Sequence, residues 1–215
     1  METGAGCFEH GAAGVRRAGF CLFFALVAVA GCMRKPVPSP DRPTPRPPDL
    51  SGAAVMVLPV QPGDWVGGGR RTPAPAGLDA ELAYWLEERA PRVRWTFPPA
   101  LEKALVRSPA LDIRLRELPV SSFLRMQVER IGDPLYGDLR RLGALADARY
   151  ALVPVAANYV EYGDGPGHVE VAAALIDTLG GAVLWFGVVK GESGPADDPA
   201  TTATAAAALA RALFP

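Results

Sequence analysis

The sequence has few residues of the kinds that most often carry chemistry. Its 215 residues include only two histidines and three cysteines, which leaves little material for a zinc site or a thiol nucleophile. It also lacks an excess of either charge, because 22 Lys and Arg nearly balance 23 Asp and Glu. A net charge of −1 offers no general attraction to nucleic acid. The composition therefore predicts no nucleic-acid partner, no metal and no cofactor.

The apolar run at 18–30 is too short to cross a membrane. Its thirteen residues would measure only about 20 Å as a helix, against a hydrocarbon core of about 30 Å. The run follows Arg16 and Arg17 and ends in small residues before Cys32. This order is typical of a secretory signal peptide. An ordinary signal peptide with an incidental cysteine and an uncleaved anchor are the alternatives.

The end of this run, Val29-Ala30-Gly31-Cys32, resembles the lipobox of bacterial lipoproteins. In that family the chain is cleaved before the cysteine, which carries fatty acyl chains such as palmitate. The resemblance implies that residues 1–31 are a signal peptide, cut between Gly31 and Cys32, and that Cys32 holds the protein on a membrane. Met33 follows the cysteine, and in enteric bacteria this favours the outer membrane, on its periplasmic side.

A proline-rich segment separates the cysteine from the rest of the chain. Residues 36–48 contain seven prolines in thirteen positions, which favours extended polyproline II over helix or strand. At about 3.1 Å per residue this segment reaches roughly 40 Å. We interpret residues 32–48 as the lipidated cysteine and a tether. A proline-rich ligand for a partner's aromatic groove is the alternative.

Residues 49–215 are long enough for one domain with a single core. Alternating and continuous apolar runs predict strands, and apolar residues at helical spacing after proline or aspartate predict helices. The expected strands are 53–60, 93–97, 150–160, 168–177 and 182–191, and the expected helices are 78–88, 98–107, 133–148 and 198–214. The fold class is α/β (α+β), with a mixed sheet of about five strands, helical crossovers, a C-terminal antiparallel meander and a closing helix.

The strand–turn–strand segment VEVAAALIDTLGGAVLWFGVVKGE, at 169–192, carries a second resemblance. An apolar strand ending in aspartate, a glycine turn and an apolar strand with tryptophan are similar to periplasmic lipoproteins with the fold of the TolB N-terminal domain. These include LpoB-type activators of peptidoglycan synthases and the curli secretion channel CsgG. A lipidated cysteine, a proline linker and a small domain look most like the LpoB arrangement, which implies that the domain binds an envelope partner.

The glycine-rich segment 63–72, GDWVGGGRRT, lies between a predicted strand and a predicted helix, where a phosphate-binding loop would lie. It lacks both the Gly-Lys-Ser/Thr of a P-loop and the third glycine of a dinucleotide fingerprint. We interpret it as a mobile surface loop. Trp65, Arg70 and Arg71 in this loop are candidate partner contacts, since tryptophan and arginine are common interface anchors.

The remaining candidates for chemistry have structural explanations. His168 has no second histidine or cysteine to complete a zinc site, and we expect it to be a solvated turn residue. Asp177 is expected to form a turn and Asp198 to cap a helix. Three tryptophans fall on inward faces of predicted elements and are expected in the core: Trp85, Trp95 and Trp185.

The sequence thus favours a non-enzymatic, membrane-anchored lipoprotein that binds or activates another component of the cell envelope. Two alternatives stay open. A periplasmic hydrolase using Asp and Glu would need two carboxylates converging in one cleft. An oligomeric secretion-channel component would form rings in detergent.

Overall fold

The computed structural model describes residues 46–63, 68–123 and 128–215. By internal contacts the chain divides into a unit of residues 1–37, which lies outside the described ranges, and a unit of residues 38–215. The predicted signal peptide, Cys32 and nearly all of the tether are therefore outside the described part. Of the helices within it, none combines the length and apolar character that a bilayer crossing needs. The described residues all belong to the second unit.

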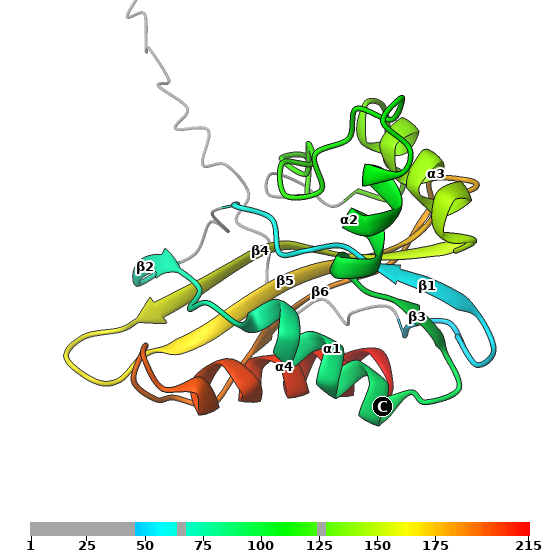
Figure 1. The fold of residues 1–215 in the computed structure, drawn as a ribbon. Coiled ribbons are helices and arrows are strands. Elements are labelled where there is room, and N and C mark those ends of the chain that lie inside the picture. Colours follow the sequence, from blue (N-terminus) through cyan, green and yellow to red (C-terminus); the bar gives the residue numbers. More distant parts are fainter. Residues whose placement is uncertain (1–45, 64–67, 124–127) are drawn as a thin grey trace, which may run out of the picture. The chain divides into compact units, whose positions relative to one another are not determined.

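A six-stranded mixed sheet forms the centre of this unit (Figure 1). Five strands follow the order β3-β1-β4-β5-β6, with β1 parallel to β3 and β4, and the last three strands antiparallel. The mixed sheet with a C-terminal meander is thus confirmed. The strands are β1 Ala54–Val57, β2 Arg70–Pro73, β3 Arg94–Thr96, β4 Tyr150–Glu161, β5 His168–Asp177 and β6 Val183–Lys190.

Strand β2, which was not predicted from the sequence, pairs antiparallel with the last four residues of β4. β4 is twelve residues long, and β1 pairs only with its first three. Because β5 occupies the other edge along nearly the whole of β4, the far half of this edge needs another partner for its backbone groups. Residues Arg70–Pro73 supply it, so the predicted loop at 63–72 is a strand from Arg70 onward.

Two helices cover each face of the sheet (Figure 1). The helices α1 and α4 lie on one face, and α2 and α3 lie on the other. Their bounds are α1 Leu78–Arg89, α2 Pro98–Val106, α3 Leu135–Ala146 and α4 Pro199–Leu213. All four agree with the predicted helices to within a few residues.

Local signals set the ends of these elements. The side chain of Asp198 accepts the backbone N–H of Ala200 at 2.9 Å, with Pro199 in the first turn of α4, so the predicted cap is confirmed. At the β5–β6 hairpin the Asp177 carboxylate accepts the N–H of Leu179 at 3.0 Å. Gly181 then takes a φ of 69°, the left-handed region that glycine enters most easily. The role predicted for Asp177 is confirmed as well.

The core consists of two apolar clusters, one on each face of the sheet. Trp185 is 2% exposed in the α1–α4 cluster, and Trp85 and Trp95 pack against the same cluster, as predicted. A bulge in β4 between Pro154 and Ala156 shifts the register by one residue. Side chains alternate across a strand, so the shift exchanges the faces beyond the bulge. Asn158 and Val160 therefore face the α2–α3 side.

Candidate binding surface around Glu170

The end of the sheet at the β4–β5 hairpin projects beyond α2 and α3 (Figure 1). On β5, the α1–α4 cluster includes Val169 and Val171, whereas the α2–α3 cluster begins only at Ala172. Alternation places His168 and Glu170 on the same face as Ala172. This face therefore continues past its apolar cluster into a group of charged side chains, which we call the Glu170 cluster: Arg71, His168, Glu170 and Lys190.

The pairing of four strands brings this cluster together. Glu170 of β5 lies opposite Lys190 of β6, and Arg71 of β2 lies opposite Val160, which in turn lies opposite His168. Paired residues on neighbouring strands share a face of the sheet. The four side chains come from residues as far apart in sequence as 71 and 190, and rigid strands hold each of them.

Glu170 is the centre of the cluster and is only 5% exposed. One carboxylate oxygen accepts a hydrogen bond from Arg71 Nη2 at 2.8 Å, and the other lies 3.2 Å from both His168 Nε2 and Lys190 Nζ. Burial raises the pKa of the Glu170 carboxyl, but the hydrogen bonds from Arg71, His168 and Lys190 outweigh burial and hold the pKa below its usual value. Glu170 is therefore a buried anion stabilised by cationic neighbours.

Only part of the hydrogen-bonding capacity of the Arg71 guanidinium is used in this cluster. Its side chain is 13% exposed, and its Nε and Nη1 atoms are buried with no hydrogen-bond acceptor among the described residues. A buried donor without an acceptor costs about 1–3 kcal/mol. Replacing a buried ion pair by apolar side chains of similar volume is often neutral or stabilising. Packing alone therefore does not explain why charged residues occupy this face.

The rim of the cluster is exposed. The Tyr162 ring stacks on the His168 ring, with centroids 6.0 Å apart and an interplanar angle of 19°. Tyr162 is 53% exposed, the Lys190 side chain is 60% exposed, and Val188 is exposed between the cluster and Phe186. With His168 neutral, Arg71 and Lys190 against Glu170 leave one positive charge in excess. The surface combines an aromatic ring, an aliphatic side chain and surplus positive charge.

Of the three residues predicted as partner contacts, Arg70 and Arg71 lie in different environments. Trp65 lies outside the described residues. Arg70 is exposed at the start of β2, where its guanidinium forms an ion pair with Glu161 at 2.6 Å. Arg71 is the buried partner of Glu170, so the prediction of a mobile loop is wrong for both arginines, which belong to a strand. Gly31 and Cys32 also lie outside the described ranges, and their predicted cleavage and lipidation stay predictions.

The prediction that His168 is a solvated turn residue is wrong. It begins β5, in agreement with the predicted strand 168–177, but its side chain is only 13% exposed and contacts Glu170 and Tyr162. Sequence reasoning also missed Glu170 and Lys190 as site residues. A signal for Glu170 was present, because it is the only charged residue between His168 and Asp177 in a strand of otherwise apolar residues. A charge inside a buried strand requires partners, although its sequence position does not say which.

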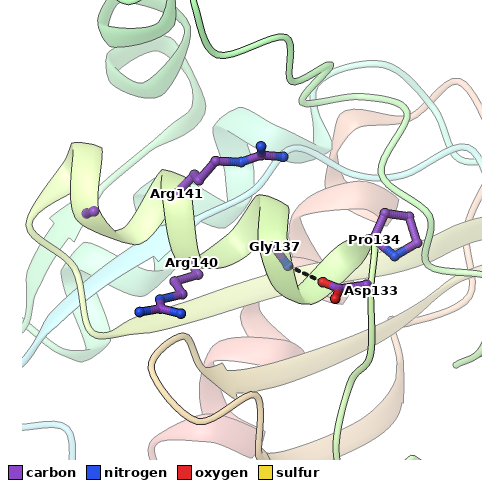
Figure 2. A pocket seen from close by; sticks show the side chains of 6 residues that line it. Asp133, Pro134, Gly137, Arg140 and Arg141 are labelled. Carbon is purple, nitrogen blue, oxygen red and sulfur yellow. Dashed lines mark hydrogen bonds between the residues drawn. The ribbon is translucent and has the colours of Figure 1, made fainter.

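One hollow of about 580 Å³ lies along α3. Figure 2 shows that Asp133, the first residue of the predicted helix 133–148, sits just before α3 and accepts the Gly137 N–H at 3.1 Å. The capping position itself is Pro134. Arg140 and Arg141 extend in different directions instead of converging (Figure 2), and Arg141 is paired with Asp138 at 2.6 Å. The hollow therefore offers no set of converging donors.

A second hollow, of about 610 Å³, lies beyond the carboxyl end of β1, between 60–63, 73–79 and the middle of β4. The Asp79 carboxylate in its wall accepts the Val60 N–H at 2.8 Å and pairs with Arg116 at 3.0 Å. The Gln61 side chain, also in the wall, donates to the backbone carbonyls of Pro59 and Leu115 and accepts the Leu118 N–H. Both side chains already serve the fold.

Within the described ranges no three His, Cys, Asp or Glu side chains are placed to hold a metal ion. Five carboxylates that are less than a third exposed have arginine partners: Asp79 with Arg116, Asp138 with Arg141, Glu161 with Arg70, Asp177 with Arg149 and Glu170 with Arg71.

No known family model matches this chain, and no curated protein is similar to it in sequence. Among solved structures, it is similar to the PelC dodecamer from Paraburkholderia phytofirmans, with 20% identity over 80% of this chain and 92% of that chain and a TM-score of 0.40. A single-residue variant of PelC from the same organism has 19% identity over 80% of this chain and 97% of that chain, with a TM-score of 0.41. Likenesses this distant carry no information on what this chain does.

Proposed function

We propose that this protein is an envelope lipoprotein, anchored by Cys32 on the periplasmic side of a bacterial outer membrane, whose α/β domain binds another envelope protein through the Glu170 cluster and its rim. The anchor rests on the signal-like segment and on the lipobox resemblance at Gly31 and Cys32. The resemblance to TolB-type and LpoB-type lipoproteins supports a binding role in place of an enzymatic one.

The observation that carries the proposal is the charged group on an otherwise apolar face of the sheet. Both apolar clusters are complete without it, and Arg71 keeps two buried donors that lack an acceptor among the described residues. Local departures from the most stable arrangement tend to occur at functional positions. Exposed Tyr162 is also a side chain typical of binding surfaces. Arg70, at the same end of the sheet, extends the surface, and Trp65 stays a candidate contact.

Site-specific photo-crosslinking in living cells tests this proposal. A photoreactive phenylalanine analogue at Tyr162 should give a crosslinked species containing one envelope protein. The matched control is Tyr84, which is 60% exposed but lies on α1, the helix on the opposite face of the sheet. No crosslink at Tyr162, or the same product from both positions, would contradict a binding role for this face.

The anchor has a separate test. The mature N-terminal peptide should carry the mass of the acyl chains on Cys32, and Cys32→Ala should abolish it. A wild-type protein recovered unmodified in the soluble fraction would contradict the anchoring.

A further inference from the structure

We infer that the partner meets this face with an acidic segment of polypeptide, whose Asp or Glu side chain pairs with Lys190. The inference rests on the proposed function and specifies the chemistry of the group that is bound. Two observations support it: the neighbours of Glu170 differ in exposure, and the cluster carries one positive charge in excess.

The three neighbours of Glu170 are not equivalent. Arg71 and His168 each have side chains only 13% exposed, whereas Lys190 is 60% exposed. If Lys190 turns to a partner, the Glu170 carboxylate keeps the hydrogen bond from Arg71 at 2.8 Å and the contact with His168 at 3.2 Å. The buried anion is then still compensated. Lys190 is thus the neighbour that is able to bind another anion while the charge of Glu170 stays compensated.

The charge of the surface selects an anion. Arg71 and Lys190 exceed Glu170 by one positive charge, and Arg70 is neutralised by Glu161. A carboxylate arriving beside Lys190 would make the group neutral, whereas an ammonium or guanidinium would add to the surplus. Complementary charge across an interface of this kind steers the encounter and rejects partners of the wrong sign.

A polypeptide fits the surface better than a membrane does. Attraction to anionic lipid takes clusters of about four to eight basic residues, and the excess here is a single charge. The rim instead has the exposed Val188 side chain two residues from Lys190 on β6, and the exposed Tyr162 ring stacked on His168, which contacts Glu170. An exposed aromatic ring is typical of protein interfaces. A peptide with an acidic side chain next to apolar ones matches this arrangement.

Zero-length crosslinking in native envelopes tests the inference directly. A carbodiimide joins an amine to a carboxylate that touches it, so mass spectrometry should find the Lys190 side chain linked to an Asp or Glu of another protein. The chain provides its own control in Lys103, an exposed lysine on α2, which should give no such product. Lys190→Gln should weaken the Tyr162 photo-crosslink roughly two- to fivefold, as expected for one partly exposed ion pair. Lys190→Arg should preserve the crosslink and Lys103→Gln should leave it unchanged.

The outcomes separate the inference from the proposed function. If Tyr162 captures a protein while Lys190 is joined only to its own Glu170, the face binds a partner but the acidic contact is wrong. If Lys190 is joined to a second copy of this chain, the surface is one of self-association and the inference is wrong. Flotation of the Cys32→Ala protein with phosphatidylglycerol vesicles, lost in Lys190→Gln, would identify a lipid surface instead and would also overturn it. If Tyr162 captures nothing, the proposed function fails first.

Discussion

Glu170→Gln should destabilise the domain strongly, although Gln has nearly the shape of Glu. The substitution removes the one negative charge that Arg71, His168 and Lys190 share. The Lys190 side chain is 60% exposed, so water is able to replace its partner. The Arg71 side chain is only 13% exposed, so its guanidinium would be left buried without an anion. Breaking a buried ion pair by removing one partner costs about 3–5 kcal/mol, and we expect roughly 3 kcal/mol because only Arg71 is left stranded.

Removing both charges should restore most of that loss. Arg71→Met combined with Glu170→Leu keeps the volume of the two side chains, removes the buried donors without acceptors and leaves nothing to be desolvated. We expect the double variant to unfold within about 1 kcal/mol of the wild type, or to be more stable. Urea denaturation of residues 49–215, followed by tryptophan fluorescence, measures Glu170→Gln and the four corners of the cycle: the wild type, Arg71→Met, Glu170→Leu and the double variant.

Two results would refute this reasoning. A neutral Glu170→Gln would mean that Glu170 does not hold Arg71 in the folded domain. A double variant as unstable as the single one would mean that the charged pair is required for packing, and the argument that this face is kept for binding would lose its basis.

Four further predictions concern other parts of the chain. The pKa of Glu170 is lower in the folded domain than its usual 4.5, so the unfolded state binds more protons as pH falls through and below that range. The free energy of unfolding should therefore decline there by a component that Glu170→Gln lacks, measured by urea titration at each pH. Trp185→Ala should cost about 3–5 kcal/mol in the same assay, since the ring is 2% exposed, and a neutral result would contradict its burial. Gly187→Ala should also destabilise the domain, because a Cβ there would lie 2.5 Å from Cζ2 of Trp185. Residues 49–215 should unfold cooperatively without the tether, since both apolar clusters lie within them, and an uncooperative transition would contradict the domain boundary.

The regular elements with strong local signals were predictable. The four helices have apolar residues at helical spacing or proline in the first turn, and the meander strands are long apolar runs separated by glycine turns. The strand β2 was not, because Arg70–Pro73 is polar, short and ends in proline. Such a segment has little strand propensity of its own, and it becomes a strand only because the far half of β4 has an unoccupied edge.

The candidate surface was less accessible to sequence reasoning than the fold. His168 follows Gly-Asp-Gly-Pro-Gly and so was expected to be solvated at the start of its strand, yet its side chain is 13% exposed and contacts Glu170 and Tyr162. Arg71 was predicted to be exposed because glycines precede it. Its burial depends on Glu170, which is 99 positions away in sequence. No local pattern contains that pairing.

Most of the helices and strands and their apolar faces were predictable from the sequence, because each depends on residues within a few positions of one another. The signal-like segment and the lipobox resemblance at Cys32 are local features too. Which charged residues meet depends instead on how distant strands align. A one-residue bulge at Pro154 in β4 sets which face Asn158 and Val160 take, and strand register then places Arg71, His168 and Lys190 around Glu170. Strand register relates segments that are distant in sequence. It is selected by burial on both faces of the sheet and by pairing of the buried charge, and these contributions to the free energy arise only when the strands assemble.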